Sequence, residues 1–452
     1  MRLLLAIWAC KLAIFASRLL GKKGSSMPGQ LAFKICPAIL TLLSKQVTKE
    51  IIVVCGTNGK TTTNNLLASY IRHAGHSLVS NEYGANMLWG VCCAFAEKAS
   101  IFGKVKAEYA CLEVDEASCV KVFRYMEPTM VVITNLFRDQ LDRYGEIDMT
   151  VDFIRRALAM APDAKLIVNG DDPLVAQFGE KANRPCYYVA VDEDTGAGVS
   201  EAKEGKFCSF CSTELLYEYH HYSQLGKFSC PSCGYKRHTP DFSVTEVSLT
   251  NGVNFTLTFG EETTRITSRF KGLYSVYNIA LSYAAARLAL NKKPDYEKVL
   301  SAYKPQVGRM EEFLIGGKTV VLNMAKNPAG FNQALDAVLQ DDREKDLLLA
   351  VNDLPQDGMD ISWLWDVEFE RLKQAKVNRL IVTGMRADEL MLRMKYAGFA
   401  EKQQIKCSDI KKAAEFLVSG ETTVCYGLAN YSSVFTLQSV IKEMEGREIS
   451  GK

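Results

Sequence analysis

The chain of 452 residues has few histidines, little net charge and no apolar run long enough to span a bilayer. Lys and Arg number 54 and Asp and Glu number 52, a formal net charge of +2. A balance this even gives no electrostatic reason to expect a nucleic-acid partner. Only five histidines occur, and the last is His238. The C-terminal part therefore has no histidine with which to activate a cysteine nucleophile.

The sequence also lacks a dense disulfide framework, an internal repeat and a low-complexity tract. Most of the 14 cysteines stand singly in apolar runs, as Cys55, Cys111 and Cys425 do. This usage is typical of buried free thiols in a reducing compartment. Hydrophobic residues make up 48% and charged residues 23%, which is ordinary for a globular protein. The length predicts two or three domains.

The first 20 residues resemble a signal peptide at first sight, but Lys11 and Arg18 interrupt the apolar run. The spacing predicts an amphipathic helix within an N-terminal helical segment, residues 1–45. We expect this helix to pack on the body of the protein; the alternative is that it lies on a membrane surface. Its basic side would carry Arg2, Lys11, Arg18, Lys22 and Lys23.

Short apolar runs alternate with helical patterns, which predicts an α/β protein with a mostly parallel sheet. A central domain is expected over residues 46–305 and a smaller C-terminal α/β domain, Rossmann-like, over residues 306–452. The strands expected in the first are residues 51–55, 109–114, 130–134 and 166–168. Those expected in the second, each followed by a helix, lie near 319–325, 347–352, 379–384 and 422–427.

Residues Gly56–Thr63 read GTNGKTTT and follow an apolar strand, while a helical pattern begins at Lys60. Glycines before a helix N-terminus let backbone N–H groups surround an anion, so this segment predicts a phosphate-binding loop. Lys60 would reach the β- and γ-phosphates, and the hydroxyl of Thr61 or Thr62 would hold Mg²⁺. The strict Walker pattern requires glycine at position 54, where this chain has valine.

Two Cys-x-x-Cys pairs lie in a polar stretch of about residues 200–245. Cys208 and Cys211 are separated from Cys230 and Cys233 by 18 residues, a spacing that fits one tetrahedral zinc ribbon. Four thiolates leave no open coordination position, so the zinc would be structural.

The form GTNGKTTT resembles the ATP loop of the Mur ligase family, which phosphorylates a carboxylate to an acyl phosphate that an amine then attacks. The family's motifs recur in the same order along the chain. They are Glu113 in LEVD, Thr134–Asn135 with Asp139–Asp142 and Gly145, Asn169–Asp172, Asn278, Gly308–Glu311 and Asn323–Pro328.

The resemblance implies ATP and Mg²⁺ as cofactors and assigns roles to individual residues. Thr61 and Glu113 would hold Mg²⁺. Asn278 would contact adenine, and Arg309 would contact the γ-phosphate. The remaining ATP contacts would come from Thr57, Asn58, Gly59, Lys60, Thr61 and Thr62.

Several positions depart from the family pattern. Gln140 and Lys326 replace histidines, and no lysine occurs between Gly145 and Lys165 to serve as the family's carbamylated lysine. Arg155 and Arg156 could supply a fixed charge near that stretch. Only about 50 residues precede the loop, where the family has a UDP-sugar-binding domain. We therefore expect a substrate that no longer carries UDP.

Within the family, the four-cysteine insertion and the run from Asp353 to Asp366 resemble one branch in particular. The resemblance implies that the chain amidates the D-glutamate α-carboxylate of the lipid II stem peptide, giving D-isoglutamine. Ammonia would come from a separate glutaminase subunit, which agrees with the distribution of histidines. The expected site of action is the cytoplasmic face of the membrane. Asp360 is the predicted catalytic residue, since it could hold ammonium or accept its proton. A helix cap is the alternative role for Asp360, and Asp357 is the rival carboxylate.

Two other functions remain open at this stage. One is an amino-acid-adding ligase of the folylpolyglutamate type, and the other is a degenerate ATPase that serves as a scaffold for a partner. The missing lysine and the cysteine pairs disfavour the first, while the complete phosphate loop and Glu113 disfavour the second.

Overall fold

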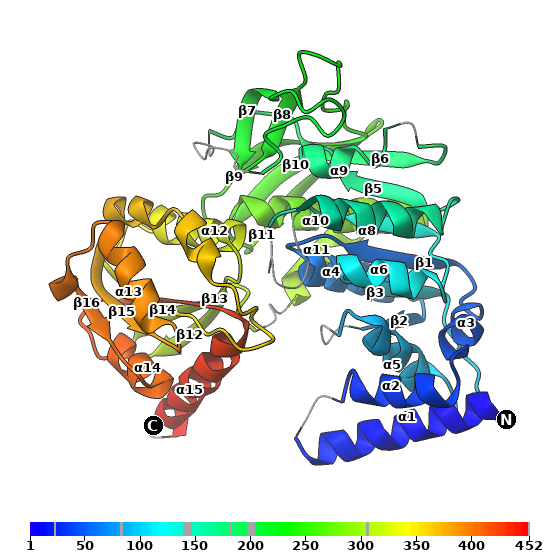
Figure 1. Cartoon of the computed structure of the whole chain (residues 1–452), viewed down its shortest axis with the longest axis horizontal. Coiled ribbons are helices and arrows are strands. Elements are labelled where there is room, and N and C mark those ends of the chain that lie inside the picture. Colours follow the sequence, from blue (N-terminus) through cyan, green and yellow to red (C-terminus); the bar gives the residue numbers. More distant parts are fainter. Residues whose placement is uncertain are drawn as a thin grey trace. The chain divides into compact units, whose positions relative to one another are not determined.

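The computed structural model describes residues 1–21, 24–81, 85–138, 147–180, 182–196, 204–303 and 307–450 (Figure 1). The chain forms two compact units. The first comprises Met1–Phe137 and Ile147–Tyr303, and the second comprises the chain from Lys304 onward together with Arg138. Both are α/β units, as the alternating sequence pattern predicts.

The first unit is built on a nine-stranded sheet in which seven strands are parallel. Parallel strands place their carboxyl ends at one edge, so the loops that follow them share that edge. An antiparallel hairpin closes the other side of the sheet. In spatial order the strands are β11 (Glu262–Ser268), β10 (Val253–Phe259), β9 (Phe242–Ser248), β6 (Cys186–Val191), β5 (Lys165–Asn169), β4 (Met130–Ile133), β1 (Glu50–Cys55), β3 (Tyr109–Glu113) and β2 (Leu78–Ser80).

Helices cover the two faces of this sheet because its strands are apolar on both sides. Ile51 and Val53 of β1 belong to a core shared with α5 (Leu88–Lys98), α6 (Glu116–Phe123) and α8 (Ile147–Ala159). The alternate residues Ile52 and Val54 are equally buried and face the other way. The remaining helices are α4 (Lys60–His73), which packs on α10 (Leu273–Leu290), α9 (Pro173–Ala176) and α11 (Tyr296–Ala302).

Three helices precede the phosphate loop: α1 (Arg2–Leu19), α2 (Met27–Ile35) and α3 (Ile39–Ser44). As expected, α1 packs on the protein, against α2 and α5 (Figure 1). Its residues Ala6, Cys10 and Ile14 are buried in that contact. Within the described ranges, no helix combines the length and apolarity needed to cross a bilayer.

The second unit holds a six-stranded sheet that is parallel except for its first strand. In spatial order the strands are β12 (Glu311–Ile315), β13 (Lys318–Met324), β17 (Val424–Ala429), β14 (Lys345–Ala350), β15 (Val377–Thr383) and β16 (Gln404–Lys406). Its α-helices are α12 (Pro328–Gln340), α13 (Ala387–Tyr396), α14 (Ile410–Val418) and α15 (Tyr431–Ser450).

The expectation of a helix after every strand of this unit is wrong for β14. A loop follows it, and then two short 3₁₀ turns, η1 (Ser362–Asp366) and η2 (Phe369–Gln374), while a third, η3 (Glu401–Gln403), precedes β16. Pro355 and Gly358, the latter with a φ of +86°, keep the loop from continuing as a helix.

Candidate active site

The phosphate loop joins β1 to α4 and requires glycine at two positions. Gly56 has a φ of +119° and Gly59 a φ of +81°. A Cβ on Gly59 would lie 2.1 Å from Oδ1 of Asn278, a residue of α10. The predicted adenine ligand Asn278 therefore lies directly against the loop that is expected to hold the phosphates. Thr61 and Thr62 occupy the first turn of α4, beside the loop.

The loop is held in shape by Thr134 and Asn135, which follow the neighbouring strand β4. Asn58 N–H donates to Asn135 Oδ1 at 2.8 Å, and Thr57 N–H donates to the Asn135 carbonyl at 2.8 Å. The Thr134 hydroxyl donates to the Asn58 carbonyl at 2.8 Å. This half of a family motif thus fixes the loop, while its other half, from Asp139 through Gln140 to Gly145, lies outside the described residues.

Lys60 points back at its own loop. Its Nζ donates to the Gly56 carbonyl at 2.5 Å and lies 3.2 Å from Glu116 Oε2. Both side chains are buried, so this is a desolvated ion pair. Glu116 was missed in the sequence analysis. Its place in the first turn of the helix after β3 could have indicated that it lies at the same sheet edge as the phosphate loop.

Glu113 ends β3 next to β1, where it pairs in register with Val54 just before the loop. Its side chain is buried, and Oε1 accepts a hydrogen bond from Asn86 Nδ2 at 2.9 Å. Asn81 holds the Glu113 backbone through its amide group. A buried carboxylate held in one orientation at the sheet edge suits a Mg²⁺ ligand. Asn81 and Asn86, which sequence reasoning missed, orient it.

The Asn169–Asp172 turn after β5 contacts the same segment. Asn169 Nδ2 donates to the Thr134 carbonyl at 3.0 Å. Asp172 accepts from Leu136 N–H at 2.8 Å and from Leu174 N–H at 3.0 Å. Burial raises the pKa of Asp172 to about 7, against the opposing effect of these two hydrogen bonds. The turn thus supports the residues that hold the phosphate loop.

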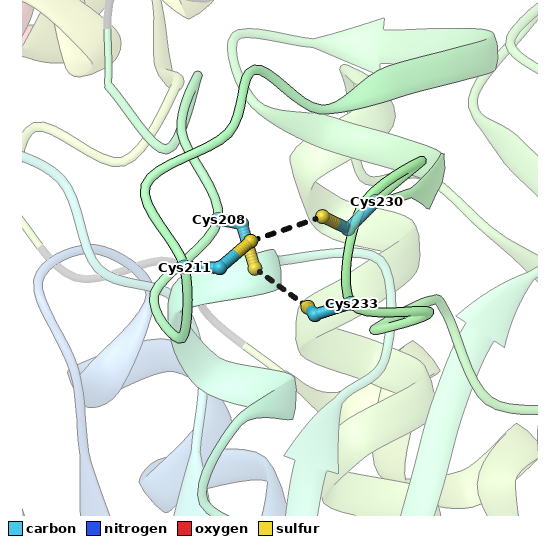
Figure 2. Close-up of side chains that lie close together, drawn as sticks. All are labelled: Cys208, Cys211, Cys230 and Cys233. Atoms are coloured by element: carbon cyan, nitrogen blue, oxygen red, sulfur yellow. Dashed lines mark hydrogen bonds between the residues drawn. The ribbon is translucent and has the colours of Figure 1, made fainter.

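The four cysteines come together in the insertion between β6 and β9 (Figure 2). Their Sγ atoms all lie within 4.8 Å of one another, with 3.5 Å between Cys208 and Cys233 and 3.4 Å between Cys211 and Cys230. Zinc–sulfur bonds of about 2.3 Å in a tetrahedron imply sulfur separations of about 3.8 Å, so the cluster has the dimensions of a zinc site. It is closed, with no fifth donor needed.

Both Cys-x-x-Cys turns have the same backbone design. Cys208 N–H donates to the Thr213 carbonyl at 2.8 Å, and Cys230 N–H donates to the Tyr235 carbonyl at 2.6 Å. Each turn is flanked by an isolated antiparallel bridge. The strands β7 (Leu216–Tyr222) and β8 (Leu225–Ser229) join the two turns, which completes a ribbon.

The ribbon is attached to the Asn169–Asp172 turn through Asp171, which is fully buried. Asp171 accepts hydrogen bonds from Arg237 Nη1 at 3.0 Å and from the Tyr277 hydroxyl at 2.8 Å. Its carbonyl accepts from Gly226 N–H at 2.9 Å. Gln224 of the ribbon also donates to the Leu136 carbonyl at 2.6 Å. The four-cysteine insertion is therefore continuous with the scaffold of the phosphate loop.

The predicted residues of the second unit lie in loops around the carboxyl edge of its sheet. Asp360 is partly exposed, and its Oδ1 accepts from Ser362 N–H at 2.8 Å, a contact that caps the turn η1. Asp357 is buried, and its Oδ1 accepts from Ser432 N–H at 2.7 Å at the start of α15. Burial raises the pKa of Asp357.

Two other motif segments of this unit contact each other. Met324 N–H donates to the Gly308 carbonyl at 2.6 Å, and Met310 N–H donates to Asn323 Oδ1 at 3.3 Å. Arg309 is partly buried between these anchored neighbours. Its predicted contact with the γ-phosphate stays a prediction.

The two arginines suggested as substitutes for the missing lysine are exposed on α8. Arg155 donates to Gln177 Oε1 at 3.3 Å, and Arg156 pairs with Asp152 one turn away at 3.5 Å. These partners give no support to a role for either arginine at the phosphate loop.

Comparison with known proteins adds the family relationship. Residues 54–286 match the Mur ligase middle domain, and residues 324–434 match the MurT ligase C-terminal domain. The chain is 36% identical over 398 residues to the lipid II isoglutaminyl synthase (glutamine-hydrolyzing) subunit MurT of Staphylococcus aureus strain COL, covering 88% of each chain. It is 32% identical to the subunit of that name from Streptococcus pneumoniae strain ATCC BAA-255 / R6, covering 93% of this chain and 92% of the relative.

Among solved structures, a pseudomurein peptide ligase type C from Methanothermus fervidus superposes with a TM-score of 0.70 at 21% identity. The superposition covers 88% of this chain and 79% of that one. At this identity the likeness is one of fold.

Proposed function

Because the chain belongs to the Mur ligase family and within it to the MurT type, we propose that it is the ATP-dependent ligase subunit of a lipid II isoglutaminyl synthase. The reaction converts the D-glutamate α-carboxylate of the lipid II stem peptide to its amide, a step of peptidoglycan synthesis. The observation that carries this assignment is the 36% identity to a MurT subunit over 88% of the chain.

The chemistry requires two steps. The substrate carboxylate attacks the γ-phosphorus of ATP, which gives an acyl phosphate and ADP. Ammonia then attacks the acyl carbon, phosphate leaves, and a proton is released as the amide forms. Catalysis of the first step depends on positioning and on charge opposite the phosphoryl oxygens.

The residues of the loop fit these demands. Backbone N–H groups of Asn58–Thr62 would surround the phosphates, with Thr57 fixing the loop, and Lys60 would exchange its loop carbonyls for phosphate oxygens. Thr61 and Glu113 would hold Mg²⁺, which when bound neutralises phosphate charge. Asn278 would contact the base and Arg309 the γ-phosphate.

We propose that the four-cysteine cluster holds one structural zinc ion. The sulfur separations and the matching turns support this assignment.

Ammonia would be supplied by a glutaminase subunit resembling GatD, in a heterodimer with this chain. The second unit contains no histidine, so it cannot complete a Cys–His glutaminase site. Next to Asp360, the side chains of Met359 and Trp365 are 67% and 52% exposed, and Tyr396 at 71% contacts the Trp365 ring. Exposed aromatic and Met side chains are typical of a protein interface, so this surface is the proposed docking site.

The reaction would take place in the cytoplasm at the inner face of the membrane, because ATP is on that side and lipid II is membrane-anchored. Asp360 would act in the second step by holding ammonium or accepting its proton.

The test is reconstitution. The purified chain, the glutaminase, ATP, glutamine and lipid II should together give an amidated stem peptide detectable by mass spectrometry, and omission of any one should prevent it. A product lengthened by an amino acid would indicate the folylpolyglutamate-type ligase. Amidation that continues without ATP turnover on this chain would leave only the scaffold function.

A further inference from the structure

The first helix has two apolar faces, and only one of them is covered. Ala6, Cys10 and Ile14 are buried against α2 and α5. The opposite face is a stripe at spacings of three and four residues, one side of a helix. Its members are Leu5, Trp8, Leu12, Phe15 and Leu19, which are 48%, 45%, 69%, 63% and 72% exposed.

The stripe continues onto the turn that follows α5. Ile101 and Phe102 are 56% and 76% exposed there, and Trp8 Nε1 donates to the Ile101 carbonyl at 2.8 Å. The apolar surface is therefore built from two separate segments that are bonded to each other. In Figure 1, α1 forms an edge of the first unit, with α2 and α5 on its inner side.

The charged residues of the N-terminal segment that carries the stripe are all basic. The first 49 residues contain eight Lys and Arg and no Asp or Glu, whereas the whole chain has a net charge of only +2. At 100° per residue, Lys11 and Arg18 flank one side of the stripe and Arg2 flanks the other. Lys11 and Arg18 are bonded to the carbonyl and the carboxylate of Glu97 in α5, which fixes their positions beside the stripe.

We propose that α1 lies in the headgroup layer of an anionic bilayer, with the stripe and the Ile101–Phe102 turn inserted at the acyl boundary. An apolar face with aromatic residues, flanked by basic residues, is the pattern of interfacial helices. The basic residues Arg2, Lys11 and Arg18 that flank the stripe complement an anionic lipid surface, which favours this occupant over a protein partner. Membrane binding by α1 does not depend on the proposed reaction, so it would hold even if the chain catalysed a different one.

The first test is co-sedimentation of the full chain with vesicles of phosphatidylcholine alone or mixed with phosphatidylglycerol. We expect binding to the anionic vesicles that weakens as salt is added. The double variant Leu12→Glu plus Phe15→Glu should reduce partitioning on the order of tenfold or more, because two apolar side chains are lost from the lipid contact. The matched control is Met149→Glu plus Leu216→Glu, which changes two exposed apolar side chains elsewhere in the first unit and should bind as the wild type does.

The second test uses Trp8, one of four tryptophans in the chain, as a depth probe. Brominated lipids should quench part of the tryptophan fluorescence, and Trp8→Phe should abolish that quenching while binding persists. Equal sedimentation of wild type and the double variant, or quenching unchanged in Trp8→Phe, would overturn the inference. So would a double variant that binds vesicles normally but loses the glutaminase or a second copy of the chain, because the stripe would then be a protein interface.

Discussion

Among single residues, Lys60 donates hydrogen bonds to carbonyls of the phosphate loop to which it belongs. Its ammonium group is already surrounded by loop carbonyls and by Glu116. A buried cation needs such partners, since an unpaired one is strongly disfavoured. In the proposed function, phosphate oxygens would replace these partners of the Lys60 ammonium group.

Lys60→Ala should lower ATP turnover on the order of a hundredfold or more, as expected when a preorganised cation opposite the phosphoryl oxygens is removed. ATP hydrolysis in the reconstituted complex measures this. Lys121→Ala, which removes an exposed lysine from α6, is the matched control. Normal hydrolysis by Lys60→Ala would show that the loop does not bind the phosphates as assigned.

Asp172 gives a prediction about pH. Its pKa is raised to about 7 in the folded protein, against about 4 in an unfolded chain. Between these values the folded state binds more protons, so this residue's contribution to the free energy of unfolding falls as pH rises from about 4 to about 7. The free energy of unfolding of wild type, relative to that of Asp172→Asn, should therefore fall by up to a few kcal/mol as pH rises from about 4 to about 7. Above pH 7 this relative value should no longer change with pH.

Denaturant unfolding at a series of pH values measures this difference. Asp163→Asn, an exposed carboxylate of the same unit, should run parallel to wild type. If the wild-type curve stays parallel to that of Asp172→Asn from pH 4 to 7, folding does not raise the pKa of Asp172.

Among the elements, the four-cysteine ribbon does more than cover a surface. Gln224 and Arg237 bond to the Leu136 carbonyl and to Asp171, which lie beside the residues holding the phosphate loop. Order in the ribbon therefore supports order in the loop.

Metal analysis should find about one zinc per chain. Cys208→Ser plus Cys230→Ser should abolish it and lower the Tm, by about 2–4 °C for each kcal/mol lost in a domain of this size. The variant should also lose ATP turnover through the ribbon's contacts with the loop scaffold. Cys407→Ser, outside the cluster, should keep both zinc and Tm, and a zinc content unaffected by the double change would refute the assignment.

The features of the fold that could be predicted from the sequence are those set by residues close together in the chain. The buried strands β1, β3 and β4 and the glycine loop follow from local apolar runs and local turn chemistry. The fully buried Asp171 and its partner Arg237 are 66 residues apart, and nothing local marks them as a pair. The same holds for Lys60 and Glu116, because only the sheet topology brings β1 and β3 together. After β14 the chain forms a loop and 3₁₀ turns where an α-helix was expected, although Pro355 and Gly358 are local signals that disfavour a helix there.

At the scale of the whole molecule, the histidines are confined to one of the two units. All five lie in the first unit, and two of them, His220 and His221, belong to the ribbon. Burial lowers the pKa of His221, a ribbon residue that packs near Asp171. Nitrogen supply and nitrogen use should therefore be separable experimentally.

Without the glutaminase, the chain should release no glutamate from glutamine, yet ammonium salts should restore at least part of the amidation. Asp360→Asn should block amidation with either nitrogen source while ATP binding and zinc content persist, because its defect would follow nitrogen delivery. Product and glutamate are measured in parallel. If Asp360→Asn amidates at the wild-type rate, its role is limited to capping η1, and Asp357→Asn is the variant to examine next.

The bond between Asp171 and Arg237 has a consequence for deletion of the ribbon. An insertion usually enters at a surface loop and can be lost again without harm to its host. Here deletion of the ribbon would take Arg237 away from Asp171, which would keep only the Tyr277 hydroxyl and the Val191 N–H as donors among the described residues. Loss of one partner costs about 3–5 kcal/mol where the other charge stays buried. The insertion could therefore be removed without this cost only if position 171 were changed as well. Because the bond between Asp171 and Arg237 does not involve the four cysteines, it would attach the ribbon to the rest of the first unit whether or not a metal is bound.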